Sequence, residues 1–366
     1  MKESDKLNDL ARQNELLREQ NDLLRQRNRL QATREIFVDD IDRDEMRSGF
    51  LITSQRKKLW NVQIGLINEF ARVCKKHKLR WFAIGGTLLG AARHKGFIPW
   101  DDDVDVAMLR PEYEKLRHII AREVKPPFSV EFWHDFRLET DEPSELADEK
   151  LPLISAEQIK KYPVHAPFFP LMKIRDERTL FLEFPKRRNT NQGIWLDIFP
   201  LDPLPPFAEK KHQLLFEAER ILFTATMHPK LIRKLMEKNQ PLGFDYDYLR
   251  EHMSLPYKQR GMRLEDFLAK NHFQSEHVGD LRDWCILKGH KFYNAKDFED
   301  VEYLPFEKIE VPAPKNFDGV LTTFYGDWHK LVITPPHVKT YSADISCEDY
   351  YTRTAGTVFD LGGSNG

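Results

Sequence analysis

The chain has few cysteines, and they form no familiar pattern. Cys74, Cys285 and Cys347 are the three cysteines among 366 residues, odd in number and far apart in the sequence. Neither a disulfide framework nor a CxxC zinc motif is visible, which is typical of a protein from a reducing cytosol.

Long apolar runs are also missing. No stretch approaches the ~18 consecutive apolar residues that would span a bilayer, and no signal-peptide pattern opens the sequence. We therefore expect a cytoplasmic protein, which could still associate peripherally with the inner face of the cell membrane.

The third thing the chain lacks is net charge. Its 56 Lys and Arg residues nearly cancel its 58 Asp and Glu residues, leaving a formal charge of −2. No global field favours a nucleic-acid partner, so we expect none, and any anion site must be local.

The sequence divides into four segments. Residues 1–36 are predicted to be a coiled-coil arm, 37–54 a linker, 55–340 the main domain and 341–366 a C-terminal tail. Helical periodicity over 208–239 and 246–270 predicts a helical elaboration at 208–300. The acidic, Pro-punctuated segment 139–160 is interpreted as a surface insertion.

The first segment repeats with period seven. One heptad position carries Leu10, Leu17 and Leu24, and the facing position carries Asn14, Asn21 and Asn28. Leucine at one core position and asparagine at the other is typical of a parallel coiled coil whose buried amides fix the register. We therefore predict a homo-oligomer; the alternatives are a solvated single helix or an arm that docks on its own domain.

Apolar spacing locates several elements of the main domain. A helix is predicted from a Ser54 cap to about Lys78, and the next helix starts at Arg110 with Pro111 in its first turn. Segment 304–314 reads as strand-turn-strand, and Phe317–Tyr325 as a helix that ends at Gly326. Short strands are predicted at 129–134, 171–174 and 179–182.

The stretch from Trp81 to Leu109 carries the strongest chemical signal. It predicts a strand, a turn at Gly85 and Gly86, a short helix from Thr87, a loop and a second strand. The glycines would let the backbone approach a phosphate, and the N–H groups at the helix start would face that anion. In the second strand Asp103 and Asp105 alternate with valines, so both carboxylates are expected on one face.

A second acidic position lies downstream. Asp197 stands inside an apolar strand at 194–204, which we expect Pro200 and Pro203 to stop. Because a buried carboxylate needs compensation, Asp103, Asp105 and Asp197 are predicted to share Mg²⁺ or Mn²⁺. Such a site serves phosphoryl transfer. The alternatives are a solvated acidic loop and, for Asp197, a strand-end turn residue.

Four cations are candidate phosphate ligands. Arg93 and His94 follow the short helix, although cations at a helix C-terminus also simply favour the helix dipole. Lys173 and Arg175 alternate along one strand, which also suits an ordinary surface strand. The aromatic face of Tyr325 or Trp328, next to Asp327, would suit a quaternary ammonium group, but aromatic core is the alternative.

The motifs IGGTLLGAARHKGFIPWDDDVDVAM and GIWLDIFPLDPLP resemble the LicD family, which includes bacterial phosphocholine transferases and animal fukutin-related proteins. The resemblance covers about residues 55–340 and also includes MKIRD, FEKIEVPAP and YGDWHKL. It implies an α/β (α+β) fold, a nucleotidyltransferase-like mixed sheet with added helices. The cysteine-bound zinc element of fukutin-related protein has no counterpart here.

The resemblance also implies roles for residues. It makes Asp103 and Asp105 metal ligands, and Asp197 a third ligand or the base for the acceptor hydroxyl. Gly85, Gly86 and Thr87 become the cradle of the donor phosphate, and the helices at 208–300 are expected to shape the acceptor side.

The implied reaction transfers a phospho-alcohol, phosphocholine first, from a CDP-linked donor to a sugar hydroxyl and releases CMP. The expected acceptor is a cell-surface glycan such as lipopolysaccharide, teichoic acid or capsule, or its lipid-linked precursor. Alternatives are ribitol-phosphate or glycerol-phosphate transfer, a conventional nucleotidyltransferase that releases pyrophosphate, and a non-catalytic scaffold.

Overall fold

The computed structural model describes most of the main domain. The described residues are 12, 35–135, 171–183, 191–204, 221–226, 229–239, 242, 244–270, 275–280, 292–333, 340–346 and 349–351. The predicted coiled coil, the insertion at 139–160, the helical segment 208–220 and most of the tail lie outside them.

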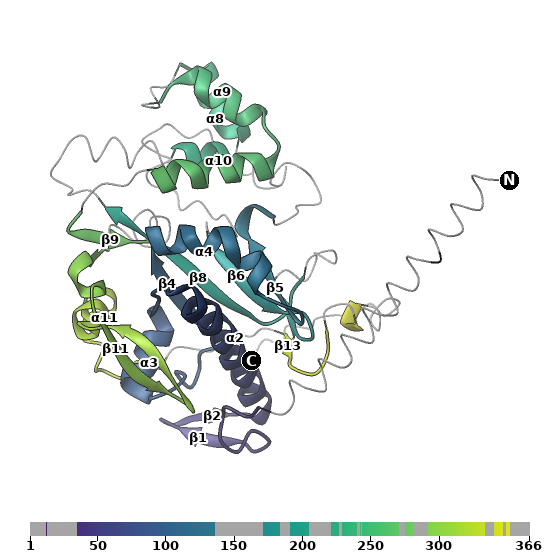
Figure 1. The fold of residues 1–366 in the computed structure, drawn as a ribbon, viewed down its shortest axis with the longest axis vertical. Helices are drawn as coiled ribbons and strands as arrows, with labels where there is room; N and C mark the ends of the chain where they lie inside the picture. The colour runs from purple at the N-terminus through teal and green to yellow at the C-terminus, as the bar shows by residue number, and fades with distance from the viewer. Residues whose placement is uncertain are drawn as a thin grey trace.

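The described residues form a seven-stranded mixed sheet at the centre of the fold (Figure 1). Its two central strands, β4 (Asp105–Leu109) and β8 (Trp195–Leu204), are parallel, and Asp105 pairs with Asp197. All other pairings in the sheet are antiparallel. They involve β3 (Phe82–Ala83), β5 (Phe128–Phe132), β6 (Met172–Asp176), β9 (His277–Gly279) and β10 (Tyr293–Asn294). The prediction of a mixed sheet is confirmed.

Strand β8 continues through both prolines, so the prediction that Pro200 and Pro203 stop it was wrong. The backbone N–H of Asp197 donates to the carbonyl oxygen of Val104, the residue before β4. Alternation along a strand then directs the missing N–H of Pro200 away from β4. On that side β6 pairs with β8 up to Ile198, and β9 begins to pair at Asp202. Pro200 therefore falls in the gap between two partners, and Pro203 lies beyond the end of the pairing with β4.

Helix α2 (Ser54–His77) packs on the sheet through the predicted apolar face. Leu59, Leu66, Phe70 and Val73 are buried, and Val62 is partly buried. The predicted cap is off by one residue: Thr53, in extended conformation, accepts the N–H of Arg56 through its side chain.

Two helices flank β4. Helix α3 (Gly85–His94) begins at the glycine pair itself, two residues before the predicted start at Thr87. Helix α4 (Arg110–Glu123) starts as predicted, with proline in its first turn. Its first residue, Arg110, forms a bidentate pair with Asp202 on β8, with N···O distances of 2.6 and 2.7 Å.

Small elements surround the sheet. The predicted hairpin is β11 (Val301–Phe306) with β12 (Ile309–Pro314), and the predicted helix is α11 (Phe317–Tyr325), with Gly326 as its C-cap. The remaining elements are β1 (Glu45–Arg47), β2 (Phe50–Ile52), η1 (Trp133–Asp135), β7 (Leu180–Phe181), η3 (Ala295–Phe298) and β13 (Tyr341–Ser342). Strand β7 pairs with β13 and not with β6.

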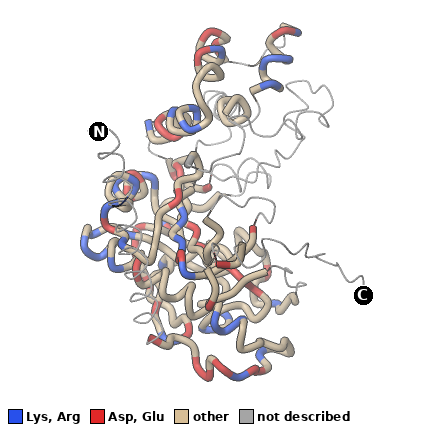
Figure 2. Tube along the Cα trace, turned by 90° about the vertical axis from the view of Figure 1, so that its right-hand side faces the viewer, with Lys and Arg blue, Asp and Glu red and all other residues tan. Residues whose placement is uncertain are grey.

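A helical layer lies beyond α4 (Figure 1). It includes α8 (Pro229–Glu237), α9 (Tyr246–Ser254) and α10 (Tyr257–Lys270). The pattern at 246–270 is therefore two helices, because Pro256 breaks it. Within the described chain, none of the helices has the length and apolar character required to cross a bilayer. Figure 2 shows acidic and basic residues interspersed along the described parts of the chain.

Candidate active site

Four carboxylates meet where β4 and β8 begin. Asp105 opens β4, and Asp197 is its partner on β8. Asp103 precedes β4 and is not part of the strand, contrary to the prediction. Asp101, which the sequence analysis did not assign to the site, interacts electrostatically with Asp103 and Asp105.

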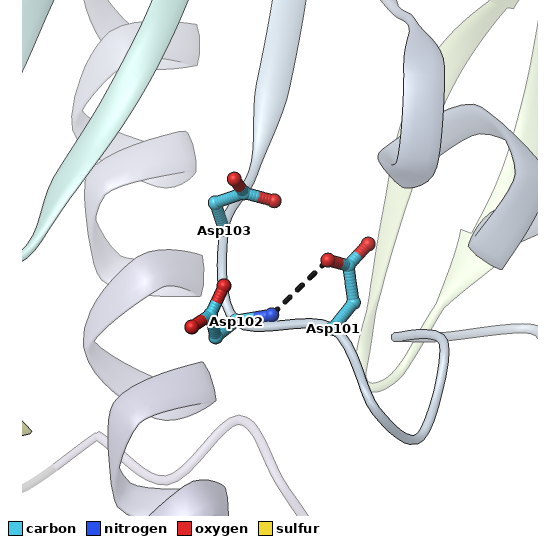
Figure 3. Close-up of side chains that lie close together, drawn as sticks. All are labelled: Asp101, Asp102 and Asp103. Atoms are coloured by element: carbon cyan, nitrogen blue, oxygen red, sulfur yellow. Dashed lines mark hydrogen bonds between the residues drawn. The ribbon is translucent and has the colours of Figure 1, made fainter. Parts of the chain in front are cut away.

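The loop before β4 presents consecutive acids. The carboxylate oxygens of Asp101, Asp102 and Asp103 can all lie within 4.8 Å of one another. Asp101 and Asp103 face each other across the turn, while Asp102 turns toward α2 (Figure 3). The backbone N–H of Asp102 donates to Asp101 Oδ1 at 3.1 Å, which fixes the Asp101 side chain. The run of three consecutive acids, Asp101 to Asp103, just before the strand was the sequence signal for Asp101.

Helix α2 anchors this loop through buried polar side chains that the sequence analysis also missed. Arg56 and Trp60 donate to the carbonyl oxygen of Asp101, at 2.7 and 3.2 Å. Gln63 donates to the carbonyl oxygen of Asp102 at 2.8 Å. Arg56 and Gln63 follow the buried face of α2, so their positions in the apolar pattern were the available signal.

The acids raise one another's pKa. Burial, followed by the Asp103 and Asp102 charges, raises the pKa of Asp101 well above its usual range. Burial and the charges of Asp103, Asp197 and Asp101 do the same to the pKa of Asp105. Carboxylates that are this costly to ionise together call for a counter-cation.

The two glycines lie directly against these carboxylates. A Cβ on Gly85 would stand 3.3 Å from Asp105 Oδ2, and one on Gly86 only 2.5 Å from Asp101 Oδ2. Gly85 also has φ = +56°, a conformation that favours glycine. The start of α3 and the acids therefore form one site.

Thr87 supports that site from within. It is buried, and its Oγ1 accepts the backbone N–H of Asp105 at 2.8 Å. This bond ties the first turn of α3 to the first residue of β4. The contact fits a positioning role for Thr87, whereas its predicted contact with the donor stays untested.

Lys173 and Arg175 differ in their surroundings. The Lys173 ammonium lies 3.3 Å from Asp197 Oδ1 and so belongs to the acidic site. The Arg175 guanidinium is buried, and it donates to Glu131, Glu183 and the carbonyl oxygen of Gly193. These contacts occupy Arg175, so we do not carry its predicted donor contact into the proposal.

Arg93 and His94 lie at the far end of α3 from the glycines. Arg93 donates to the carbonyl oxygens of Trp328 and Lys330 and, through Nε, to His94 Nε2. Burial and nearby arginines lower the pKa of His94 to about 4, so the imidazole is neutral at pH 7. His94 therefore offers no positive charge to a phosphate at that pH.

Tyr325 lies close enough to the acids to interact with them electrostatically. Burial and the Asp105, Asp101 and Asp103 charges raise the pKa of Tyr325, although 43% of the residue is exposed. Trp328 is buried, with its indole N–H donating to Asp318, and Asp327 is exposed. The geometry leaves Tyr325 as the aromatic candidate beside the site.

The donor set of the acidic cluster fits a divalent metal. Asp101, Asp103, Asp105 and Asp197 offer only carboxylate oxygens, the ligands that Mg²⁺ and Mn²⁺ prefer. Lys173 is a cation paired with this cluster, through Asp197. One ammonium group does not neutralise four carboxylates, which leaves the site with charge for a metal.

Comparison with known proteins shows what the region around this site is similar to. Residues 78–207 match the family described as LicD/FKTN/FKRP, nucleotidyltransferase domain. The lipopolysaccharide cholinephosphotransferase LicD of Haemophilus influenzae is 26% identical over 288 residues, which cover 74% of this chain and 89% of that relative.

Two shorter matches come from Rickettsia. The uncharacterized protein RP689 of Rickettsia prowazekii is 30% identical over 67 residues, which cover 18% of this chain and 25% of the relative. The uncharacterized protein RT0683 of Rickettsia typhi is 33% identical over 69 residues, or 19% of this chain and 22% of the relative.

The matched region contains the whole acidic cluster, both glycines and Lys173. The resemblance noted in the sequence is thus confirmed, and with it the prediction of a LicD-type phosphotransferase enzyme. Residues 78–207 of this chain thus match a nucleotidyltransferase domain of the LicD type.

Proposed function

We propose that this enzyme transfers phosphocholine from CDP-choline to a sugar hydroxyl of a cell-surface glycan or its lipid-linked precursor and releases CMP, with Mg²⁺ or Mn²⁺. The observation that carries the proposal is the cluster of four carboxylates against the glycine start of α3. Phosphocholine is preferred because the long match is to a lipopolysaccharide cholinephosphotransferase.

The residues of the site have distinct tasks in this reaction. A divalent metal bound by the carboxylates would neutralise charge on the donor diphosphate. Asp103 and Asp105 would hold that metal, and Asp101 would complete its oxygen ligands. Gly85 and Gly86 leave room for phosphate oxygens at the N-terminus of α3.

In the proposed reaction Asp197 receives the proton of the acceptor hydroxyl. The hydroxyl oxygen forms a new bond to the phosphorus that carries choline, and the bond from that phosphorus to the bridging oxygen breaks. The electron pair leaves with CMP, and the hydroxyl proton moves to the Asp197 carboxylate. The alternative role of Asp197 is that of a further metal ligand.

The first experiment identifies the donor. The full-length chain with Mg²⁺ is incubated with CDP-choline, CDP-ribitol, CDP-glycerol, CDP-ethanolamine or CTP, with glycan acceptors present, and CMP and pyrophosphate are measured. We expect CMP from CDP-choline, and none once the metal is chelated. Preference for another CDP-alcohol would reassign the alcohol, and pyrophosphate release from CTP would favour a conventional nucleotidyltransferase.

Substitution of the acids tests the site itself. Asp103→Asn and Asp105→Asn keep side-chain size but remove ligand charge, so we expect CMP release to fall at least ~100-fold. Asp300→Asn is a matched control, because Asp300 is exposed and pairs with surface Lys315. Full activity in either site variant, with folding verified by circular dichroism, would refute the assignment.

A further inference from the structure

Lys173, predicted from the sequence to bind the donor phosphate, contacts side chains of the protein instead. Its Nζ lies 3.3 Å from Asp197 Oδ1 and 3.0 Å from Glu183 Oε1. It also stands 4.4 Å from the centre of the Trp195 ring. Lys173 donates a hydrogen bond to Glu183, whereas its contact with Asp197 Oδ1 is an ion pair without a hydrogen bond.

Asp197 is held from both sides by the same group of residues. Lys173 stands at its Oδ1, and the Trp195 indole N–H donates to its Oδ2 at 3.0 Å. Trp195 is buried and Lys173 is only 16% exposed, so neither contact is easily replaced by water. The Asp197 carboxylate therefore has a fixed orientation toward Asp105, its partner across β4 and β8.

Lys173 is itself held by a row of alternating charges. Glu183 bridges Lys173 and Arg175, with N···O distances of 3.0 and 2.7 Å. Arg175 continues to Glu131 at 2.6 Å. Lys173 and Arg175 lower the pKa of Glu183 to about 2 despite its burial, so Glu183 is ionised at neutral pH.

We propose that Lys173 is a positioning residue: it orients Asp197 and offsets the charge of the acidic cluster, and Glu183 holds it in place. The part of this role that concerns turnover rests on the proposed function. This assignment replaces the predicted contact between Lys173 and the donor phosphate. It makes the row from Asp197 to Glu131 the structural support of the site.

Metal affinity tests the assignment without turnover. In Lys173→Met a positive charge leaves the metal site, so we expect Mn²⁺ to bind several-fold more tightly by electron paramagnetic resonance titration. In Glu183→Gln a nearby negative charge is lost and Lys173 pairs with Asp197 alone, so Mn²⁺ should bind several-fold more weakly. Lys173→Arg keeps the charge and should stay within about twofold of wild type. Lys315→Met, which breaks a surface pair with Asp300, is the matched control.

Kinetics separates positioning from donor binding. With CDP-choline, we expect Lys173→Met to lower kcat at least ~10-fold and to change KM less than about twofold, with partial recovery of kcat in Lys173→Arg. A KM increase of ~10-fold or more with kcat maintained would overturn the proposal in favour of a donor contact. Unchanged or weaker Mn²⁺ binding in Lys173→Met would also overturn it.

The two proposals fail in different ways. If the wild-type chain releases no CMP from any CDP-alcohol, the proposed function fails, and the opposed Mn²⁺ shifts of Lys173→Met and Glu183→Gln still decide the role of Lys173. If a substitution at Lys173 prevents folding, Mn²⁺ binding by Glu183→Gln still tests the proposal. Glutamine preserves the size of the side chain beside Arg175, so this variant should fold.

Discussion

At the scale of single residues, the site depends on two glycines, which have no side chain, as much as on its charged residues. The acids before β4 can converge because Gly85 and Gly86 bring backbone, without a Cβ, to within contact of Asp105 and Asp101. The same two positions would have to accept phosphate oxygens in the proposed reaction. Any added atom there therefore acts on both the metal ligands and the donor.

We predict that Gly86→Ala impairs function more than folding. The new Cβ would lie 2.5 Å from Asp101 Oδ2, the end of a side chain that can turn away. Rotation of Asp101 limits the stability cost to about 1 kcal/mol, but it removes one carboxylate from the cluster. CMP release should fall at least ~10-fold, and Mn²⁺ should bind more weakly.

Gly65→Ala provides the matched comparison. Gly65 lies inside α2, and a Cβ there meets nothing within 4 Å. Alanine in a helix interior should raise the free energy of unfolding by about 0.5–1 kcal/mol, measured by urea denaturation, and leave activity unchanged. Equal activity losses in the two alanine variants would contradict the proposed role of Gly86.

At the scale of elements, β8 connects the chemistry to the stability of the fold. Its first half pairs with β6 and carries Asp197, and its second half pairs with β9 and carries Asp202. The Asp202 carboxylate accepts two hydrogen bonds from the guanidinium of Arg110, the first residue of α4. Both side chains are almost fully buried. This pair fixes the start of α4 against the sheet.

We predict that Asp202→Ala destabilises the chain by about 3–5 kcal/mol, because it leaves the Arg110 charge buried without its main partner. The free energy of unfolding by urea is the measurement. In the double variant Arg110→Met, Asp202→Leu no charge of the pair remains, so most of that loss should be recovered. A double variant as unstable as Asp202→Ala would argue against this explanation.

At the scale of the whole molecule, the helical layer meets the sheet through α10 and α4. Glu265 of α10 is fully buried, 3.1 Å from His134 of η1, and Asp266 pairs with Arg117 of α4 at 3.4 Å. These contacts join the layer to α4 and η1, and Figure 1 shows the layer beyond α4. The expectation that segment 208–300 shapes the acceptor side remains a prediction.

The assembly state is a prediction at the same scale. The heptads of residues 1–36 fall outside the described residues, whereas the folded domain is already anchored at Phe37, whose N–H donates to Asn61. We expect the full chain to be an oligomer by light scattering, and a chain that begins at residue 35 to be a monomer with similar CMP release per chain. A monomeric full-length chain would refute the coiled coil.

The sequence by itself was sufficient for features that depend on neighbouring residues. The apolar face of α2, the start of α4, the hairpin β11–β12 and the helix that ends at Gly326 all follow from local periodicity and turn chemistry. The motifs around Gly85 and Asp103 also contained the family and the expectation of a metal-phosphate site.

Only the tertiary structure decided how distant charges and strands combine. It showed that Asp101 belongs to the acidic cluster and that β8 continues past Pro200. It also showed that Lys173 contacts the cluster whereas Arg175 is bound elsewhere. Each of these findings depends on contacts in space. Asp101 interacts with the carboxylate of Asp105, Lys173 pairs with that of Asp197, and Pro200 lies between the segments of β8 that pair with β6 and β9. Charge interactions and strand pairing act through space, so no periodicity along the sequence records which partner a side chain or a backbone N–H will meet.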